Sequence, residues 1–278
     1  MNRVVVVGAG QMGSGIAQVC AAAELEVVMV DVGEELLARG LAAIERSQAR
    51  LAEKGGVSAE DVLGQITTSQ AVPDGAADCG IEAVTEDEAA KRAVLAELDD
   101  RLPSGAIIAT NTSSIPITRL SQATRRPELF IGMHFMNPVP MLPLVEVIRG
   151  LRTSDATVEA TIKLAKRLGK TPVEANDFPG FIGNRILMPM INEAVFALME
   201  GVGTAAAIDE VMKLGMRHPL GPLSLADLIG LDTCLSVMEV MHEGLGDPKY
   251  RPCPLLRQYV EAGWLGRKTG RGFYEYAE

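Results

Sequence analysis

Residues 3–13 read RVVVVGAGQMG, and this stretch decides the fold. The run Arg3–Val7 is apolar and β-branched, which is typical of a buried parallel strand. It leads directly into a Gly-x-Gly-x-x-Gly turn, and a helical pattern follows from Gln11 to Glu24. A second strand is expected at Val27–Val30, and it ends at Asp31. The order strand, glycine turn, helix, strand and acid predicts a dinucleotide-binding βαβ unit.

Each glycine of the turn has a separate physical reason. Gly8 permits the tight turn, Gly10 lets the backbone approach a pyrophosphate, and Gly13 lets the helix pack closely on the strand. The helix opens at Gln11 and Met12, where free N–H groups and a partial positive charge favour phosphates. The turn therefore predicts the phosphate end of a cofactor site.

Asp31 indicates which dinucleotide is bound. Its carboxylate can accept hydrogen bonds from ribose hydroxyls, and it would repel a 2′-phosphate. No Arg or Lys follows it until Arg39. We therefore expect NAD rather than NADP. A glycine-rich turn without ligand and an FAD site are the alternatives, and nothing else in the chain suggests a flavin.

The rest of the chain divides into an alternating half and a helical half. Strands are expected at 79–84, 106–109 and 129–135, with helices at 34–54 and 91–101. After the breaker cluster Phe178-Pro179-Gly180 the apolar spacing is helical only, at 186–198, 205–214, 223–241 and 255–260. This pattern predicts an α/β fold, with an N-terminal Rossmann-type doubly wound sheet over residues 1–180 and a C-terminal all-α domain over 181–278.

Composition excludes several classes of protein. The 278 residues are 47% hydrophobic and carry a formal charge of −10, so neither a disordered chain nor a partner of nucleic acid or of an anionic membrane is expected. The four cysteines form no C-x-x-C pair, which favours a reducing compartment over a disulfide framework. The first apolar run is too short for a signal peptide, and no stretch is long enough to span a bilayer. A cytoplasmic location is therefore expected.

Two apolar strands near the middle each carry one titratable residue. His134 lies in the run 129–135, and Glu146 lies in the run 144–148. If the two runs pair antiparallel about Pro140, the two residues fall opposite each other. A buried carboxylate needs a partner, and this partner would fix the tautomer of His134 and stabilise its charged form. The pattern suits a general base, although a purely structural pair has the same spacing.

Polar residues at two other positions are candidates for the same site. The loop Asn111–Ser114 follows a predicted strand, so it lies at the carboxyl edge of the sheet, where hydroxyls could bind a substrate oxygen. Asn184 opens the first helix after the domain break and could reach the same oxygen. An ordinary polar loop and a helix-start residue are the alternatives. His134, His218 and His242 are isolated from other metal ligands, so no metal site is expected.

Six segments together resemble one family. They are GAGQMGSGIAQ, the NTSS loop, GMHFMNPVPMLPLVEVI, NDFPGFIGNR, HPLGPLSLADLIGLDT and GRKTGRGFYEY. The chain resembles the 3-hydroxyacyl-CoA dehydrogenases over nearly its whole length, in particular the short-chain enzymes that act on 3-hydroxybutyryl-CoA.

The resemblance assigns a role to each catalytic candidate. It implies that His134 is the catalytic base, that Glu146 orients it, and that Ser113 and Asn184 hold the substrate oxygen. Asn137 would add a hydrogen bond to the substrate. The implied reaction is the reversible, NAD-dependent oxidation of a (3S)-3-hydroxyacyl-CoA to the 3-oxo thioester.

The resemblance also extends the two binding sites. It implies that Glu86, Lys91 and Asn111 complete the cofactor site and that Ser47 and Lys54 contact the CoA moiety. The chain departs from the family in having Asp87 where asparagine is usual, and in having Thr85 for an aliphatic residue.

The family resemblance further implies a homodimer formed through the helical domain. Two other functions remain open from the residues alone. One is an NAD-dependent sugar-acid dehydrogenase on the same fold, against which Ser47 and Lys54 argue mildly. The other is a non-catalytic dinucleotide-binding protein, which would require a broken set of catalytic residues.

Overall fold

The computed structural model describes residues 1–75 and 77–276. It divides the chain into two compact units, Met1–Phe178 (unit 1) and Pro179–Glu278 (unit 2). Each unit has its own hydrophobic core. Within the described residues no helix has the length and apolarity needed to cross a membrane.

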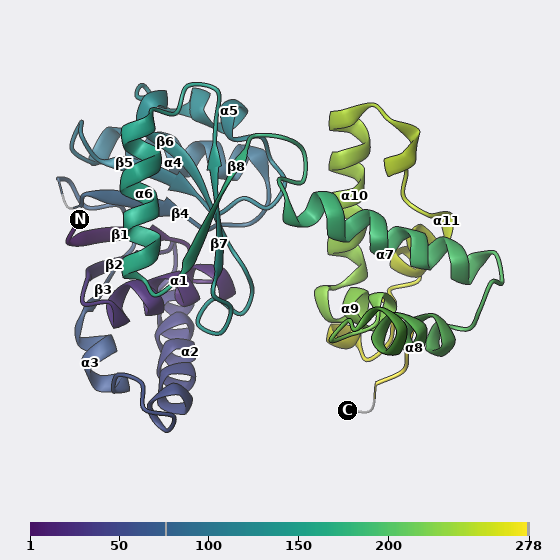
Figure 1. The fold of residues 1–278 in the computed structure, drawn as a ribbon. Coiled ribbons are helices and arrows are strands. Elements are labelled where there is room, and N and C mark those ends of the chain that lie inside the picture. The colour runs from purple at the N-terminus through teal and green to yellow at the C-terminus, as the bar shows by residue number, and fades with distance from the viewer. Residues whose placement is uncertain (76, 277–278) are drawn as a thin grey trace. The chain divides into compact units, whose positions relative to one another are not determined.

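Unit 1 is built on one sheet flanked by helices (Figure 1). The strands are β1 (Arg3–Val7), β2 (Glu26–Val30), β3 (Ile66–Ser69), β4 (Cys79–Glu82), β5 (Ile107–Thr110), β6 (Phe130–Phe135), β7 (Leu144–Arg149) and β8 (Thr171–Asn176). The helices are α1 (Gln11–Ala22), α2 (Glu34–Ala52), α3 (Ala59–Gly64), α4 (Glu88–Arg101), α5 (Ile117–Leu120) and α6 (Asp155–Arg167).

The strand order is β3-β2-β1-β4-β5-β6-β7-β8, and each neighbouring pair is parallel except β6 with β7. The chain moves outward from β1 to β3 and then crosses to β4 on the other side of β1. The order therefore reverses between β1 and β4, and in such folds ligands bind outside the carboxyl ends of the strands at that point. The predicted doubly wound α/β fold is confirmed.

The alternation along the strands explains the two helical layers. Val4 and Val6 of β1 point into the core that α1 and α6 share, together with Ile81 of β4. Gly80 of β4 points to the opposite face, where Leu98 of α4 lies against it. Successive strand residues face opposite sides of a sheet, so the buried β-branched runs fill two cores at once.

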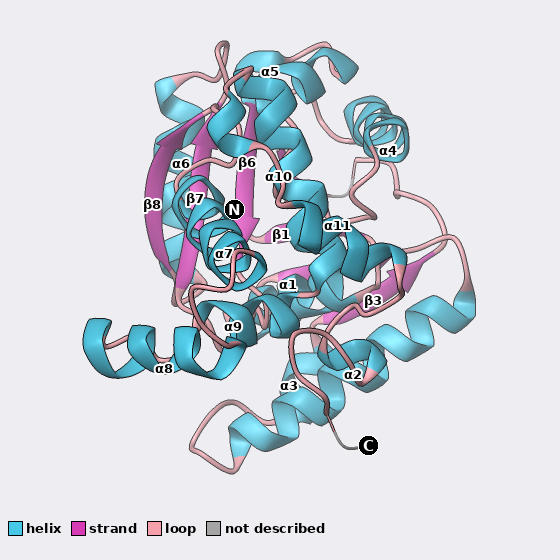
Figure 2. Ribbon diagram, turned by 90° about the vertical axis from the view of Figure 1, so that its right-hand side faces the viewer, coloured by secondary structure: helices cyan, strands magenta, loops and turns pink. Residues whose placement is uncertain are grey.

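Unit 2 consists of helices joined by loops (Figure 2). Its α-helices are α7 (Gly183–Met199), α8 (Ala205–Met216), α9 (Pro222–Ile229), α10 (Leu231–Leu245) and α11 (Pro254–Glu261). The expectation of a single helix over 223–241 is wrong. Gly230 interrupts it with a φ of 104°, a conformation that L side chains rarely adopt, so the chain turns between α9 and α10.

A buried carboxylate on α9 anchors the segment that follows α11. Asp227 is 1% exposed and accepts hydrogen bonds from the backbone N–H groups of Phe273 and Tyr274 and from the hydroxyl of Tyr276. Burial raises the pKa of the Asp227 carboxyl, although the three hydrogen bonds oppose that rise.

A second buried carboxylate, on α8, caps the next helix. Asp209 is 3% exposed and accepts hydrogen bonds from the N–H groups of Leu223 and Ser224, in the first turn of α9. The hydroxyl of Tyr274 donates to the same carboxylate at 2.8 Å. The first N–H groups of a helix have no partner within it, so Asp209 satisfies two of them from outside.

Candidate active site

The glycine turn joins β1 to α1 and leaves room for a phosphate. A Cβ added at Gly13 would lie 1.8 Å from the carbonyl oxygen of Gly8, so only glycine allows the helix to start so close to the strand. Gly8 itself has a φ of 110°. A Cβ added at Gly10 would meet nothing within 4 Å, and the space beside it stays open for a ligand. This cradle, at a helix N-terminus, fits a pyrophosphate.

Asp31 lies directly after β2 and is tied to the glycine turn. One carboxylate oxygen accepts the N–H of Ala9 at 2.7 Å, and the other accepts the N–H of Val32 at 2.8 Å. These bonds fix a negative charge beside the turn, where the adenosine ribose of a dinucleotide would lie. The arrangement fits NAD and opposes the extra phosphate of NADP.

His134 and Glu146 are cross-strand neighbours, as the spacing about Pro140 predicts. They are directly paired in the antiparallel register of β6 and β7. The Nδ1 atom of His134 lies 2.8 Å from Oε2 of Glu146, and the two side chains are 8% and 2% exposed. Because a carboxylate accepts hydrogen bonds, Nδ1 carries the proton in the neutral ring. The Nε2 atom is then the basic nitrogen.

The basic nitrogen of His134 faces the loop Asn111–Ser114 (the serine loop). Its Nε2 lies 3.1 Å from Oγ of Ser113, in the loop that follows β5. Both groups lie at the carboxyl edge of the sheet, as the glycine turn does. A hydroxyl and an unprotonated imidazole nitrogen at this distance could both form hydrogen bonds with the hydroxyl group of one substrate.

The carboxylate of Glu86 accepts several hydrogen bonds from the serine loop. Oε1 of Glu86 accepts the N–H of Ser113 at 2.8 Å, the hydroxyl of Thr112 at 2.7 Å, and both the N–H and the hydroxyl of Ser114 at 3.0 Å. Burial alone would raise the pKa of Glu86, but Lys91 and these hydrogen bonds outweigh it and lower the pKa. The ion pair with Lys91 and the hydrogen bonds from the loop therefore favour the ionised form of Glu86.

Lys91 forms an ion pair with Glu86 and is 1% exposed. Its Nζ lies 2.9 Å from Oε1 of Glu82, 3.3 Å from Oε2 of Glu86 and 3.3 Å from the carbonyl oxygen of Val84. Glu82 ends β4 and is 0% exposed. Sequence reasoning missed Glu82, although a single acid that closes an apolar strand at the carboxyl edge was a usable signal.

Two further residues near the edge have clear structural tasks. Oδ1 of Asn111 accepts the N–H of Phe135 at 2.9 Å, which ties the end of β6, next to His134, to the serine loop. Asp87 is the N-cap of α4, and its carboxylate accepts the N–H of Ala90 at 2.8 Å. Asparagine, the residue expected here from the family resemblance, could form the same cap, since both residues cap helices well.

The two expected CoA contacts lie on one face of α2 and its end. Ser47 lines a cavity of about 550 Å³, and the other lining residues include Gly10, Gln11 and Asn137. Lys54 and Ser47 together line a neighbouring cavity of about 460 Å³. Arg46 and Arg50 line this second cavity as well, and sequence reasoning missed both. Cations without an acid among the lining residues suit a phosphate-bearing ligand.

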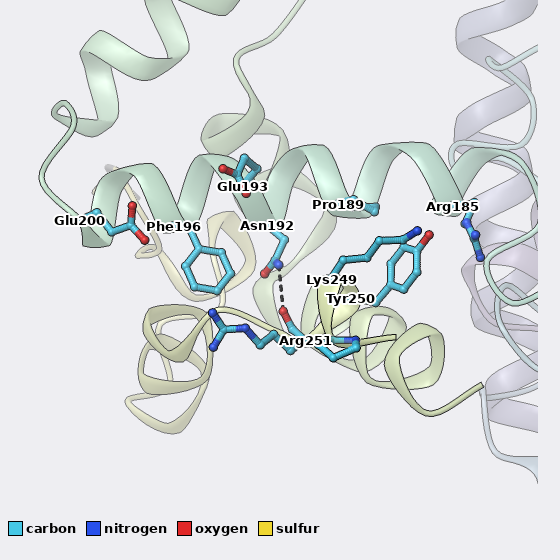
Figure 3. Close-up of a pocket in the computed structure, with 10 residues that line it drawn as sticks. Arg185, Pro189, Asn192, Glu193, Phe196, Glu200, Lys249, Tyr250 and Arg251 are labelled. Carbon is cyan, nitrogen blue, oxygen red and sulfur yellow. Dashed lines mark hydrogen bonds between the residues drawn. The ribbon is translucent and has the colours of Figure 1, made fainter. Parts of the chain in front are cut away.

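Asn184 belongs to unit 2, where it is the second residue of α7. A cavity of about 470 Å³ lies further along this helix, within the same unit (Figure 3). Its walls include Arg185, whose guanidinium lies 4.7 Å from the centre of the Tyr250 ring. Asn192 bridges the two sides, because its amide donates to the carbonyl oxygen of Arg251 at 3.0 Å. None of the predicted site residues lines this cavity.

Two family models match nearly the whole chain. The model described as 3-hydroxyacyl-CoA dehydrogenase, NAD binding domain, matches residues 3–178. The model described as 3-hydroxyacyl-CoA dehydrogenase, C-terminal domain, matches residues 180–276. The predicted cofactor, NAD, is therefore confirmed by the family of unit 1.

Proteins named as 3-hydroxybutyryl-CoA dehydrogenases are similar to this chain over nearly their full length. A probable 3-hydroxybutyryl-CoA dehydrogenase of Bacillus subtilis (strain 168) is 56% identical over 282 residues, which covers 100% of this chain and 98% of that protein. The 3-hydroxybutyryl-CoA dehydrogenase of Bradyrhizobium diazoefficiens is also 56% identical and covers 99% of this chain and 96% of its own. The crystal structure of (S)-3-hydroxybutyryl-CoA dehydrogenase from Ralstonia eutropha superposes with a TM-score of 0.97, at 50% identity and with full coverage of both chains. The chain thus belongs to the 3-hydroxyacyl-CoA dehydrogenase family.

Proposed function

We propose that this protein catalyses the reversible, NAD-dependent oxidation of a (3S)-3-hydroxyacyl-CoA, with 3-hydroxybutyryl-CoA as its substrate. One observation carries the proposal. A histidine that is oriented by a buried carboxylate presents its basic nitrogen to Ser113 at the carboxyl edge of a dinucleotide-binding sheet. The names of the relatives supply the substrate class.

His134 is the proposed general base. In oxidation its Nε2 takes the proton of the 3-hydroxyl group while the hydrogen on C3 leaves as hydride. In reduction the same nitrogen returns the proton. Bound NAD supplies the hydride acceptor, and the protein's part is to align the carbon, move one proton and hold the oxygen. Glu146 keeps the ring oriented and stabilises its protonated form.

The remaining catalytic and cofactor residues are assigned around this proton transfer. Ser113 donates a hydrogen bond to the developing carbonyl oxygen, and Asn184 of unit 2 polarises the same oxygen. The cofactor's phosphates bind at the glycine turn (Gly8, Gly10, Gln11, Met12, Gly13), and its riboses are recognised by Asp31, Glu86, Lys91 and Asn111.

The CoA moiety is proposed to lie along α2. Ser47 and Lys54 line the cavities that support this proposal, and Asn137 lies in the turn beside them. Lys54 is exposed and free to follow a mobile phosphate. A sugar acid offers no phosphate to such a surface, which is why the CoA thioester is favoured over the sugar-acid alternative.

Unit 2 is proposed to form a homodimer interface in addition to its part in substrate binding. The support is a set of large apolar side chains that water would otherwise contact, since Val211, Leu214 and Met216 of α8 are 60%, 75% and 62% exposed. Sedimentation of the purified protein at twice its monomer mass is the expected result. A cytoplasmic location remains a prediction, and the four unpaired thiols agree with a reducing compartment.

An NADH-absorbance assay tests the proposed reaction. Acetoacetyl-CoA should be reduced by NADH, and longer 3-oxoacyl-CoAs measure the preferred chain length. Free sugar acids are the rival substrates, and they are assayed in the direction of oxidation with NAD. Replacing NADH by NADPH should lower kcat/KM by at least about tenfold, because Asp31 repels the added phosphate. Turnover of a sugar acid without turnover of acetoacetyl-CoA would overturn the proposal.

A further inference from the structure

The carboxyl edge of β4 holds a buried ion pair, and one of its members, Glu82, has no role among those proposed above. Glu82 is 0% exposed and Lys91 is 1% exposed, and their charged atoms lie 2.9 Å apart. Removing two charges from water is costly, and a well-packed apolar pair in the same space is often as stable. A buried pair beside an active site therefore calls for an explanation other than stability.

The environment of Glu82 leaves its carboxylate fully engaged. Oε1 accepts Lys91 Nζ and also the N–H of Val84 at 2.7 Å, while Oε2 accepts the hydroxyl of Thr110 at 2.5 Å. The donors to this carboxylate thus come from the loop after β4, from α4 and from β5. The carboxylate provides a rigid acceptor on which an ammonium group can be held.

Lys91 connects the fixed carboxylate of Glu82 to the carboxylate of Glu86. An ammonium group has three N–H donors, and three acceptors lie within 3.3 Å of it: Glu82, Glu86 and the carbonyl of Val84. The contacts of Lys91 with Glu82 and Val84 are hydrogen bonds, and its contact with Glu86 is an ion pair at 3.3 Å. Besides the cofactor contact proposed above, Lys91 holds Oε2 of Glu86, while Oε1 of Glu86 accepts the N–H of Ser113.

We infer that the buried Glu82–Lys91 pair is a positioning device, which fixes Glu86 and through it the loop that carries Ser113. The chain of contacts runs from Glu82 to Lys91, to Glu86 Oε2, and from Oε1 to the N–H of Ser113. A displacement of about 1 Å at a group that contacts the reacting atoms can cost about 100-fold in rate. This inference rests on the proposed function, because that assigns Ser113 to the substrate oxygen.

A double variant separates positioning from stability. Lys91→Met alone leaves the carboxylate of Glu82 buried without a counter-charge, and its Tm should fall sharply. Glu82→Gln/Lys91→Met removes both charges at nearly constant volume, and Gln can keep its bonds to Val84 and Thr110. Its Tm should recover most of the loss, but kcat for acetoacetyl-CoA, measured at saturating NADH so that a weakened cofactor contact is compensated, should stay about 30-fold below wild type, since Glu86 has lost its anchor. Recovery of kcat together with Tm would overturn the inference.

The matched control lies on the same helix. Asp99 of α4 is also buried and paired with a cation, Arg126, at 2.7 Å, but at the opposite end of the helix from Lys91. Asp99→Asn should lower Tm while kcat stays within about twofold of wild type. A loss of kcat as large as that of the double variant would mean that any buried pair on α4 has the same effect.

Two further measurements identify the route through Ser113. Ser113→Ala should lower kcat about tenfold in the wild type but add less than about threefold in the Glu82→Gln/Lys91→Met background, whereas additive losses would exclude the route. Hydrogen exchange at 112–115 should be faster in the double variant without any substrate present, because Glu86 no longer holds the loop N–H groups. Unchanged exchange would refute positioning even if acetoacetyl-CoA is a substrate. Faster exchange in an enzyme that ignores acetoacetyl-CoA would instead refute the proposed function.

Discussion

Both units bury carboxylates, but the partners of these carboxylates differ. In unit 1, Glu146 is paired with the side chain of His134, and Glu82 is paired with the ammonium group of Lys91 in addition to accepting the N–H of Val84 and the hydroxyl of Thr110. In unit 2, Asp209 and Asp227 accept hydrogen bonds from backbone N–H groups and tyrosine hydroxyls. Side-chain partners can respond to a ligand, whereas backbone partners exist only when the chain is folded. The difference indicates that the first set serves chemistry and the second serves the fold.

The largest expected effect is at the proposed base. His134→Ala should lower kcat for acetoacetyl-CoA by about 1000-fold, equivalent to about 4 kcal/mol in the activation barrier, because no group remains to transfer the proton. NADH binding, measured by fluorescence titration, should stay close to wild type. Unchanged turnover would remove His134 from the mechanism and break the comparison between the units.

Removal of a backbone-bound carboxylate should affect stability instead. Asp209→Ala leaves two N–H groups in the first turn of α9 without their acceptor, so the free energy of unfolding should fall by about 3 kcal/mol in urea titrations. The kcat of the folded enzyme should change less than about twofold. Asp232→Asn is the control, since its ion pair with Lys268 is exposed, and it should cost less than about 1 kcal/mol.

Glu146 should behave as a catalytic partner and not as a structural one. Glu146→Gln keeps the shape of the side chain but cannot stabilise a charged imidazole, and kcat should fall about 100-fold, or about 2.7 kcal/mol. Glu174→Gln on the neighbouring strand, in an exposed pair with Arg149, should leave kcat unchanged. If Glu146→Gln lowers Tm but not kcat, the pair is structural and unit 1 resembles unit 2 in this respect.

The smallest effect is expected at Asp99, the structural exception in unit 1, and it depends on pH. Burial would raise the pKa of Asp99, but hydrogen bonds from Arg126 and Arg125 outweigh it and lower the pKa. A depressed folded-state pKa stabilises the protein above the ordinary aspartate value of about 3.9, and the benefit is lost as the pH falls through the depressed value. The Tm difference between wild type and Asp99→Asn should therefore have its full but modest size at pH 7 and shrink below about pH 4. A difference that does not depend on pH would contradict this assignment.

The buried central strands could be predicted from the sequence, and the edge strands could not. The strand Arg3–Val7 is observed at its predicted bounds, because its neighbours bury both faces and leave a continuous apolar run. The edge strand β3 was missed, since its sequence ITTS remains partly exposed and shows no such run. The edge strand β8 was also missed, because it contains Pro172 and is mostly exposed.

The same distinction applies to the site. The pairing of His134 with Glu146 follows from counting residues on either side of a turn, because strand register is periodic. The contacts that Glu86 makes with the serine loop join segments 26 to 28 residues apart, and no local pattern encodes them. The family resemblance indicated Glu86 and Lys91, but only the structure shows that Glu82 forms an ion pair with Lys91.

The hydrogen bonds to Asp227 also bear on how the protein is made. α9 is complete by Ile229, yet the groups that satisfy its buried carboxylate come from Phe273, Tyr274 and Tyr276. The buried site of Asp227 can therefore be completed only after the chain through Tyr276 has been synthesised, and water solvates the carboxylate until then. Unit 1 is under no such constraint, since every partner of its own buried pairs has been synthesised long before that point.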